Sequence, residues 1–279
     1  MTKSCLDSLD HRKFDNSTSV IAQYFYSFHF QDWIIYALID SGIYPIFKDP
    51  VYVELAVNEP IRHSNTFIFD KCHGWKGICV EPNPAYHKSI FLTRRCKIED
   101  TCVSNETGVV TFTHQEGASK IVSEGTTRTP HKKKIQKFSA NCTTLDSILE
   151  RHGYTHVNYM SLDIEGHELQ ALMSINWSKR TFDILTIENP SEHIIQYLKE
   201  KSVHYAFCVG PDGFFVHENY IEQVRRWFRQ VGQNSLHGCI HADLICEPRP
   251  SCMSLVRDIL ALRGGKSGKL LDTSVFRSS

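Results

Sequence analysis

Short apolar runs alternate with amphipathic segments along most of the chain, and this alternation predicts its secondary structure. Six runs are typical of buried strands: Val51–Ala56, Lys76–Val80, Cys96–Val103, Val109–Phe112, Val157–Leu162 and Phe182–Ile187. Tyr205–Val209 and Phe214–Val216, joined by a Gly-Pro-Asp-Gly turn, predict a closing hairpin. Strands that alternate with helices and end in a hairpin indicate a three-layer α/β domain.

Between the strands, apolar residues recur three and four positions apart, as on helices with one buried face. Four such helices are predicted to begin near Ser64, Thr144, Gly166 and Ser191. Their inward residues are, in order, Phe67, Ile68 and Cys72; Leu145, Ile148 and Leu149; Leu169, Leu172 and Met173; and Ile194, Ile195 and Leu198. An earlier helical pattern contains two apolar groups, Ile21, Tyr24, Phe25 and Phe28, then Trp33, Ile34, Ala37 and Leu38.

The same patterns divide the chain into three parts. Residues 1–18 are polar and aperiodic and predict a flexible arm, residues 19–235 hold the α/β domain, and residues 236–279 form a C-terminal extension. The extension contains five side chains that could bind zinc, although their spacing fits no common zinc module: His237, Cys239, His241, Cys246 and Cys252.

Charge and hydropathy favour a soluble cytoplasmic protein. The 31 Lys and Arg residues balance the 31 Asp and Glu residues, so no overall field favours nucleic acid or an anionic membrane. No apolar run reaches the roughly 18 residues of a membrane span, and the N-terminus has no apolar core like that of a signal peptide. One local basic run is either a solvated loop or a patch for an anionic substrate: Arg128, His131, Lys132, Lys133, Lys134 and Lys137.

Two features argue weakly against the cytoplasm. The chain has 10 cysteines, and glycosylation sequons begin at Asn16, Asn105, Asn141 and Asn176. Cys79 and Cys208 lie in apolar strand-like runs, so we expect them to be buried small hydrophobic residues rather than disulfide partners.

Polar residues follow three of the predicted strands directly. Glu81 follows one, Asp163 another, and Glu188 and Asn189 the third. Ligands of parallel sheets bind outside these strand ends, where an acid suits the two hydroxyls of a ribose. In the alternative interpretation, Glu81 only ends a strand in solvent. His167 is a candidate general base because its ordinary pKa lies near neutrality, and it is equally a candidate for a structural hydrogen bond.

Two longer segments resemble the signature segments of the FkbM family of S-adenosylmethionine-dependent methyltransferases. They are Gly74–Pro84, with the sequence GWKGICVEPNP, and Ser161–Glu168, with the sequence SLDIEGHE. Shorter matches fall in the expected order and include Gln31-Asp32, Ser64-Asn65-Thr66, Thr144-Leu145-Asp146 and Ile187-Glu188. The resemblance covers about residues 27 to 220.

The resemblance implies a Rossmann-like class I methyltransferase fold: a mostly parallel seven-stranded sheet with helices on both faces and a C-terminal antiparallel hairpin. It implies S-adenosylmethionine as cofactor, held by Glu54, Ala56, Asn58, Glu81, Pro82 and Asp163. The reaction would move a methyl group to a hydroxyl of a sugar, glycan or other small molecule. His167 would be the first candidate base and Glu165 the second, with Asp163 closing the site from the neighbouring strand. Ranked below this mechanism, Asp163, Glu188 and Asn189 would hold Mg²⁺ to acidify the hydroxyl.

The chain departs from the family pattern in the turn after the first strand. The family pattern resembles Asp-x-Gly-Ala-Asn-Asp-Gly, whereas this chain has Ala56 and Pro60 in place of the glycines. We expect Ala56 to fit if its φ is negative, and Pro60 removes a backbone donor. This change keeps open a non-catalytic binding module of the same fold. A nucleic-acid methyltransferase is a weaker alternative, supported only by the basic run.

Overall fold

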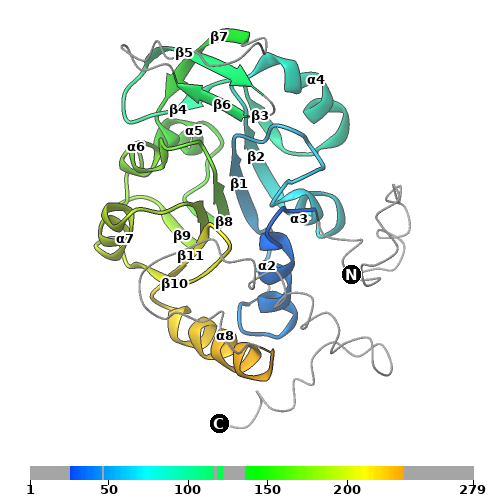
Figure 1. Ribbon diagram of the computed structural model, residues 1–279, viewed down its shortest axis with the longest axis vertical. Coiled ribbons are helices and arrows are strands. Elements are labelled where there is room, and N and C mark those ends of the chain that lie inside the picture. The colour runs from blue at the N-terminus through cyan, green and yellow to red at the C-terminus, as the bar shows by residue number, and fades with distance from the viewer. Residues whose placement is uncertain (1–25, 46, 116–117, 122–135, 236–279) are drawn as a thin grey trace.

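The computed structural model describes residues 26–45, 47–115, 118–121 and 136–235, and its centre is a seven-stranded sheet (Figure 1). The strand order is β10-β11-β9-β8-β1-β2-β3. The strands are β1 (Val51–Leu55), β2 (Lys76–Val80), β3 (Lys97–Glu99), β8 (His156–Leu162), β9 (Thr181–Glu188), β10 (Val203–Val209) and β11 (Asp212–His217). β11 runs antiparallel to both its neighbours, and the other pairs are parallel. The predicted fold class, including the terminal hairpin, is confirmed.

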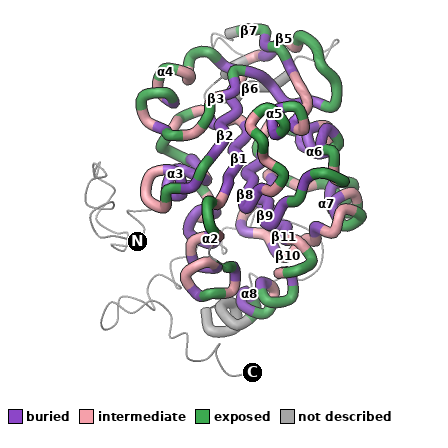
Figure 2. Tube along the Cα trace, turned by 180° about the vertical axis from the view of Figure 1, so that it is seen from behind, coloured by how far each residue is buried: buried purple, intermediate pink, exposed green. Residues whose placement is uncertain are grey.

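Helices cover both faces of this sheet because each strand buries side chains on both sides. Tyr52 of β1 packs in one core with α2 (Gln31–Asp40), α3 (Phe67–Cys72) and α8 (Ile221–Ser235). Its neighbours Val51 and Val53 face the other core, with α5 (Leu145–Arg151), α6 (Glu168–Met173) and α7 (Glu192–Lys199). The buried strands run through the middle of the tube in Figure 2. Among the described helices, none combines the length and the apolar character that crossing a bilayer requires.

A second, four-stranded sheet lies near the carboxyl ends of β1 and β2, beside α4 (Pro84–Thr93) (Figure 1). Its strands are β4 (Cys102–Val103), β5 (Gly108–Gln115), β6 (Ala118–Ile121) and β7 (Gln136–Thr143), in the order β4-β7-β5-β6. The prediction of one strand over residues 96–103 was therefore wrong. The chain leaves β3 at Glu99, and the Thr101 hydroxyl donates to the Asn141 carbonyl of β7, which commits the next residues to the small sheet.

The predicted helices need correction at three points. α6 begins at Glu168 rather than at Gly166, because Gly166 has a φ of 97°, outside the helical region. Met173, at the end of α6, is 52% exposed and does not pack inward. Phe28 lies in a turn before α2 and is 61% exposed. The predicted arm, the C-terminal extension with its zinc candidates, and basic residues 128–134 lie outside the described residues.

Two disulfides join cysteines of the described chain, Cys79 to Cys96 and Cys102 to Cys142. Cys79 is fully buried as expected, but the expectation that it has no disulfide partner was wrong. β2 and β3 pair in parallel, and Cys96 directly precedes β3, so the two Cα atoms come within 5.7 Å. That separation suits a disulfide. Only the strand pairing reveals it, since the residues are 17 positions apart.

Candidate active site

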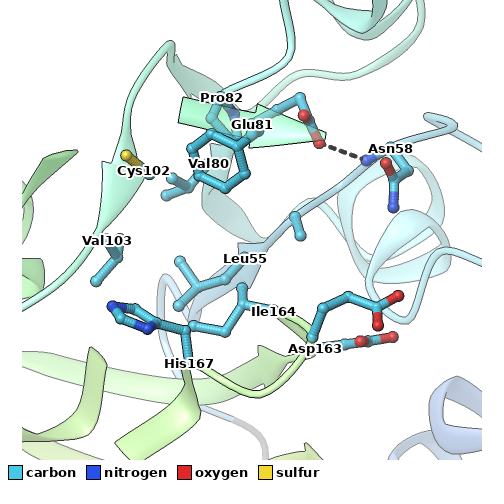
Figure 3. Close-up of a pocket in the computed structure, with 13 residues that line it drawn as sticks. Leu55, Asn58, Val80, Glu81, Pro82, Cys102, Val103, Asp163, Ile164 and His167 are labelled. Carbon is cyan, nitrogen blue, oxygen red and sulfur yellow. Dashed lines mark hydrogen bonds between the residues drawn. The ribbon is translucent and has the colours of Figure 1, made fainter. Parts of the chain in front are cut away.

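A cavity opens at the carboxyl ends of β1, β2 and β8, between the large sheet and the small one (Figure 3). It encloses about 660 Å³ of space between atoms, counted to its open mouth. The cavity is lined by Leu55, Ala56, Asn58, Val80, Glu81, Pro82, Cys102, Val103, Phe112, Asp163, Ile164, Glu165 and His167. Its lining combines carboxylates and an amide with apolar side chains, as the lining of small-molecule sites does.

The turn after β1 keeps a glycine-like conformation without glycine. Ala56 has a φ of 56° and Asn58 a φ of 50°, both in the left-handed region. The condition under which we expected Ala56 to fit, a negative φ, is therefore not met. For a residue with a Cβ atom, the left-handed conformation costs about 1–2 kcal/mol of conformational free energy. Contacts elsewhere in the fold must therefore offset this cost. Pro60 lies outside the cavity lining, and its carbonyl accepts a hydrogen bond from Arg94.

Glu81 directly follows β2 and forms one wall of the cavity. Its Oε2 accepts from the backbone N–H of Asn58, and its Oε1 from that of Asn83, both at 2.8 Å (Figure 3). Burial raises the pKa of Glu81 above its ordinary value, and the two N–H donors oppose that rise. A carboxylate has about four acceptor positions, so Glu81 retains capacity for ligand hydroxyls.

Asp163 and Glu188, at the ends of β8 and β9, form an acid pair. Asp163 is exposed at the cavity, and partial desolvation by the surrounding residues raises its pKa above the ordinary value. The neighbouring Glu188 charge and a hydrogen bond between the two carboxyls raise the pKa of Asp163 further. For Glu188, burial raises the pKa while the bond from Asp163 lowers it. The two neighbouring acids therefore hold a proton more readily than an isolated carboxyl does.

The magnesium hypothesis gains no support from this geometry. Within the described part of the chain, no group of three or more His, Cys, Asp and Glu side chains is arranged to hold a metal ion. Glu188 does not line the cavity, and Asn189 is exposed.

His167 lies beside Val103, and Ile164 separates it from Asp163 (Figure 3). Its Nε2 is 3.1 Å from the hydroxyl of Ser104, the residue after β4. Burial lowers the pKa of His167, so the ring is neutral near pH 7. His167 and Asp163, two of the candidate bases, thus lie in different parts of one cavity.

Glu54 does not line the cavity, because a buried network binds its carboxylate. It accepts from the Ser64 and Thr66 hydroxyls, from the backbone N–H of Asn65, and from Arg94 at 3.0 Å. Arg94 also donates to Asp70 at 2.8 Å. The Arg94 side chain is fully buried, yet in the sequence it looks like an ordinary charged residue after a helix. No local pattern identifies its partners.

A third polar cluster surrounds Asp212, the first residue of β11. Asp212 pairs in register with Glu188, and its Oδ2 is 2.8 Å from Nδ1 of His29 and 2.6 Å from Nε2 of Gln31. Burial raises the pKa of Asp212. In the sequence, the pair Gln31-Asp32 resembles the family pattern and could draw attention to Gln31. Asp212 lies in a Gly-Pro-Asp-Gly turn, where an aspartate is common, so the sequence does not single it out.

The cavity thus brings together most of the predicted site residues, and it adds small-sheet side chains that the sequence did not indicate. Those brought together are Ala56, Asn58, Glu81, Pro82, Asp163, Glu165 and His167; Glu54, Glu188 and Asn189 do not line it. Cys102, Val103 and Phe112 come from β4 and β5. Apolar walls with a carboxylate and an amide at one side suit a flat heterocycle joined to a polyhydroxyl group.

Comparison with known proteins assigns the domain. A family model described as the methyltransferase FkbM domain matches residues 54–234. No curated protein shows significant similarity to the chain. The matched range begins in β1, ends in α8 and contains every residue that lines the cavity.

Proposed function

Because the chain belongs to the FkbM methyltransferase family, we propose that it transfers a methyl group from S-adenosylmethionine to a hydroxyl of a sugar, glycan or other small molecule. The observation that carries the proposal is Glu81, a carboxylate at the end of β2 that lines a cavity at the carboxyl edge of the sheet. When bound, S-adenosylmethionine would supply an electrophilic methyl group on a sulfonium.

The lining residues fit this cofactor part by part. Glu81 would accept hydrogen bonds from the ribose hydroxyls. Val103 and Phe112 offer an apolar wall for the adenine, next to His167. Asn58 and Asp163 would bind the amino-acid end, and the left-handed turn at Ala56 brings backbone to the same side.

The acids of the cavity lining are the best candidates to remove the proton from the acceptor hydroxyl. Asp163 and Glu165 both line the cavity, and Asp163 lies on the other side of Ile164 from His167 (Figure 3). A raised pKa makes a carboxylate a better proton acceptor, provided that the pH is high enough to ionise it. We therefore propose Asp163 ahead of His167 as the base, with Glu165 as a second acid of the same lining and His167 near the adenine.

A non-catalytic binding module is the alternative, and the loss of two glycines suggests it. The left-handed turn and the position of Pro60 outside the cavity support a site that still accepts cofactor. Of the basic run behind the nucleic-acid alternative, only Lys137 on β7 lies in the described chain, so that alternative gains nothing.

The cellular compartment is a separate question. The sequence led us to expect the cytoplasm, where disulfides are rare. The Cys79–Cys96 and Cys102–Cys142 bonds favour an oxidising compartment instead.

Isothermal titration calorimetry with S-adenosylmethionine, and separately with its demethylated product, tests the cofactor site. Glu81→Gln should weaken binding at least about tenfold, since a hydrogen bond to a charged group contributes about 1.5–3 kcal/mol. Glu200→Gln, at the exposed end of α7, is the matched control and should bind normally. Absence of binding heat with both ligands in the unmodified protein would refute the cofactor assignment.

Methyl transfer itself is tested with radiolabelled S-adenosylmethionine and a panel of sugars, glycans and small hydroxylated acceptors. Transfer to any of them removes the non-catalytic alternative. Binding of the cofactor without transfer to any acceptor supports that alternative.

A further inference from the structure

The disulfides and the sequons point to the same compartment by independent routes. Cys102 and Cys142 join β4 to β7, and Cys79 and Cys96 join β2 to the residue before β3. Such bonds persist where the surroundings are oxidising, as in the secretory route. Asparagine-linked glycosylation takes place in the same route, and the chain carries four sequons.

Three sequons lie in the described chain, and all three asparagines are exposed. Asn105 is in the bend between β4 and β5, Asn141 is on β7, and Asn176 follows α6. None of them lines the cavity. An attached oligosaccharide would therefore extend into solvent and leave the candidate active site open.

The surroundings of Asn141 fit a glycan attachment site. Its strand neighbours Ala140 and Cys142 are buried, so Asn141 points away from the small core. Val109 lies directly across from it on β5 and is 71% exposed. The first sugar on Asn141 would cover this apolar side chain, which otherwise faces water.

Asn176 has a local geometry suited to its sequon. Its Oδ1 accepts from both the backbone N–H of Ser178, at 3.2 Å, and the Ser178 hydroxyl, at 2.7 Å. The hydroxyl of the third sequon residue thus already contacts the carboxamide that would be modified.

We propose that the chain carries asparagine-linked oligosaccharides at Asn105, Asn141 and Asn176. In each transfer, the side-chain nitrogen forms a bond to the anomeric carbon of an oligosaccharide and loses one proton. The bond from that carbon to a lipid pyrophosphate donor breaks, and the pyrophosphate leaves with the electron pair and takes up the proton. The proposal does not depend on methyl transfer.

Glycosidase treatment of the native protein, isolated from its own cells and followed by peptide mass spectrometry, tests this inference. A glycosidase that cleaves the amide link converts each formerly modified asparagine to aspartate, so the expected result is aspartate at the three positions. A position that stays asparagine is removed from the proposal. If all three stay asparagine, the inference is overturned.

Variants expressed in the same cells separate loss of the sequon from loss of the fold. Thr143→Val and Ser178→Ala should each remove one glycan-sized step in electrophoretic mobility. Thr143→Ser and Ser178→Thr preserve the hydroxyl and should retain that step. Equal mobility of Thr143→Val and Thr143→Ser would refute modification at Asn141.

Discussion

Replacing Arg94 by methionine tests the buried network that supports the turn after β1. Arg94 donates to Glu54, Asp70 and the carbonyl of Pro60. Methionine has similar length but no charge and no donors. The substitution leaves two buried carboxylates without their cation, and it frees the turn that carries Ala56.

The size of the effect follows from burial. The side chains of Arg94 and Asp70 are fully buried, and that of Glu54 is 5% exposed. Removing one partner from a buried ion pair costs about 3–5 kcal/mol. For a domain of this size, each kcal/mol lowers the melting temperature by about 2–4 °C. We therefore expect Arg94→Met to melt about 6–20 °C lower than the unmodified protein.

Urea and thermal unfolding, followed by circular dichroism with the disulfides intact, measure this loss. Arg95→Met is the matched control, since Arg95 is the next residue and is exposed. Its substitution should change stability by less than about 0.5 kcal/mol.

A triple variant distinguishes the proposed cause from simple loss of packing. Glu54→Gln and Asp70→Asn, added to Arg94→Met, remove the orphaned charges and should restore at least half of the lost stability. A loss below about 1 kcal/mol for Arg94→Met would show that the ion pairs do not hold this region together. A triple variant that is no more stable than Arg94→Met alone would lead to the same conclusion.

Three further predictions use the same unfolding assay. Ala56→Gly should raise stability by about 0.5–1 kcal/mol, because relief of left-handed strain exceeds the entropy cost of glycine, whereas Ala37→Gly within α2 should lower it by about 1 kcal/mol or more. The folded state keeps a proton on Asp163 that the unfolded chain loses near pH 4, so the stability that this residue contributes should fall as pH rises from about 4 through its raised pKa. Asp163→Asn should flatten this part of the plot of unfolding free energy against pH, and an unchanged plot would contradict the raised pKa of Asp163. Replacing Cys102 and Cys142 by serine opens a loop of 40 residues and should cost roughly 4 kcal/mol, with no measurable cost expected if the bond does not form.

The fold could be predicted because its signals are local. Each central strand is a short apolar run, and acids directly follow β2 and β8, so the amino-acid pattern alone indicates Glu81 and Asp163. The division of residues 97–103 between two sheets could not be predicted in the same way. It depends on Thr101 bonding to Asn141, which lies 40 positions away.

The site could be predicted less completely, since its remaining features depend on contacts between distant residues. Arg94 binds Glu54 across 40 positions, which moves that acid from the cavity into the core. The pairing of Asp212 with Glu188 requires the strand order. The backbone angle of Ala56 opposes the ordinary preference of alanine, so the sequence alone pointed the other way.

The turn after β1 also affects how relatives of this chain should be recognised. A search that demands glycine at its two characteristic positions would discard this protein as degenerate. The backbone nevertheless follows the path that glycine permits, with alanine at the first position and proline set aside at the second. Backbone shape persists at this corner of the sheet after the usual residues have changed, and chains with similar replacements merit assay before they are classed as inactive.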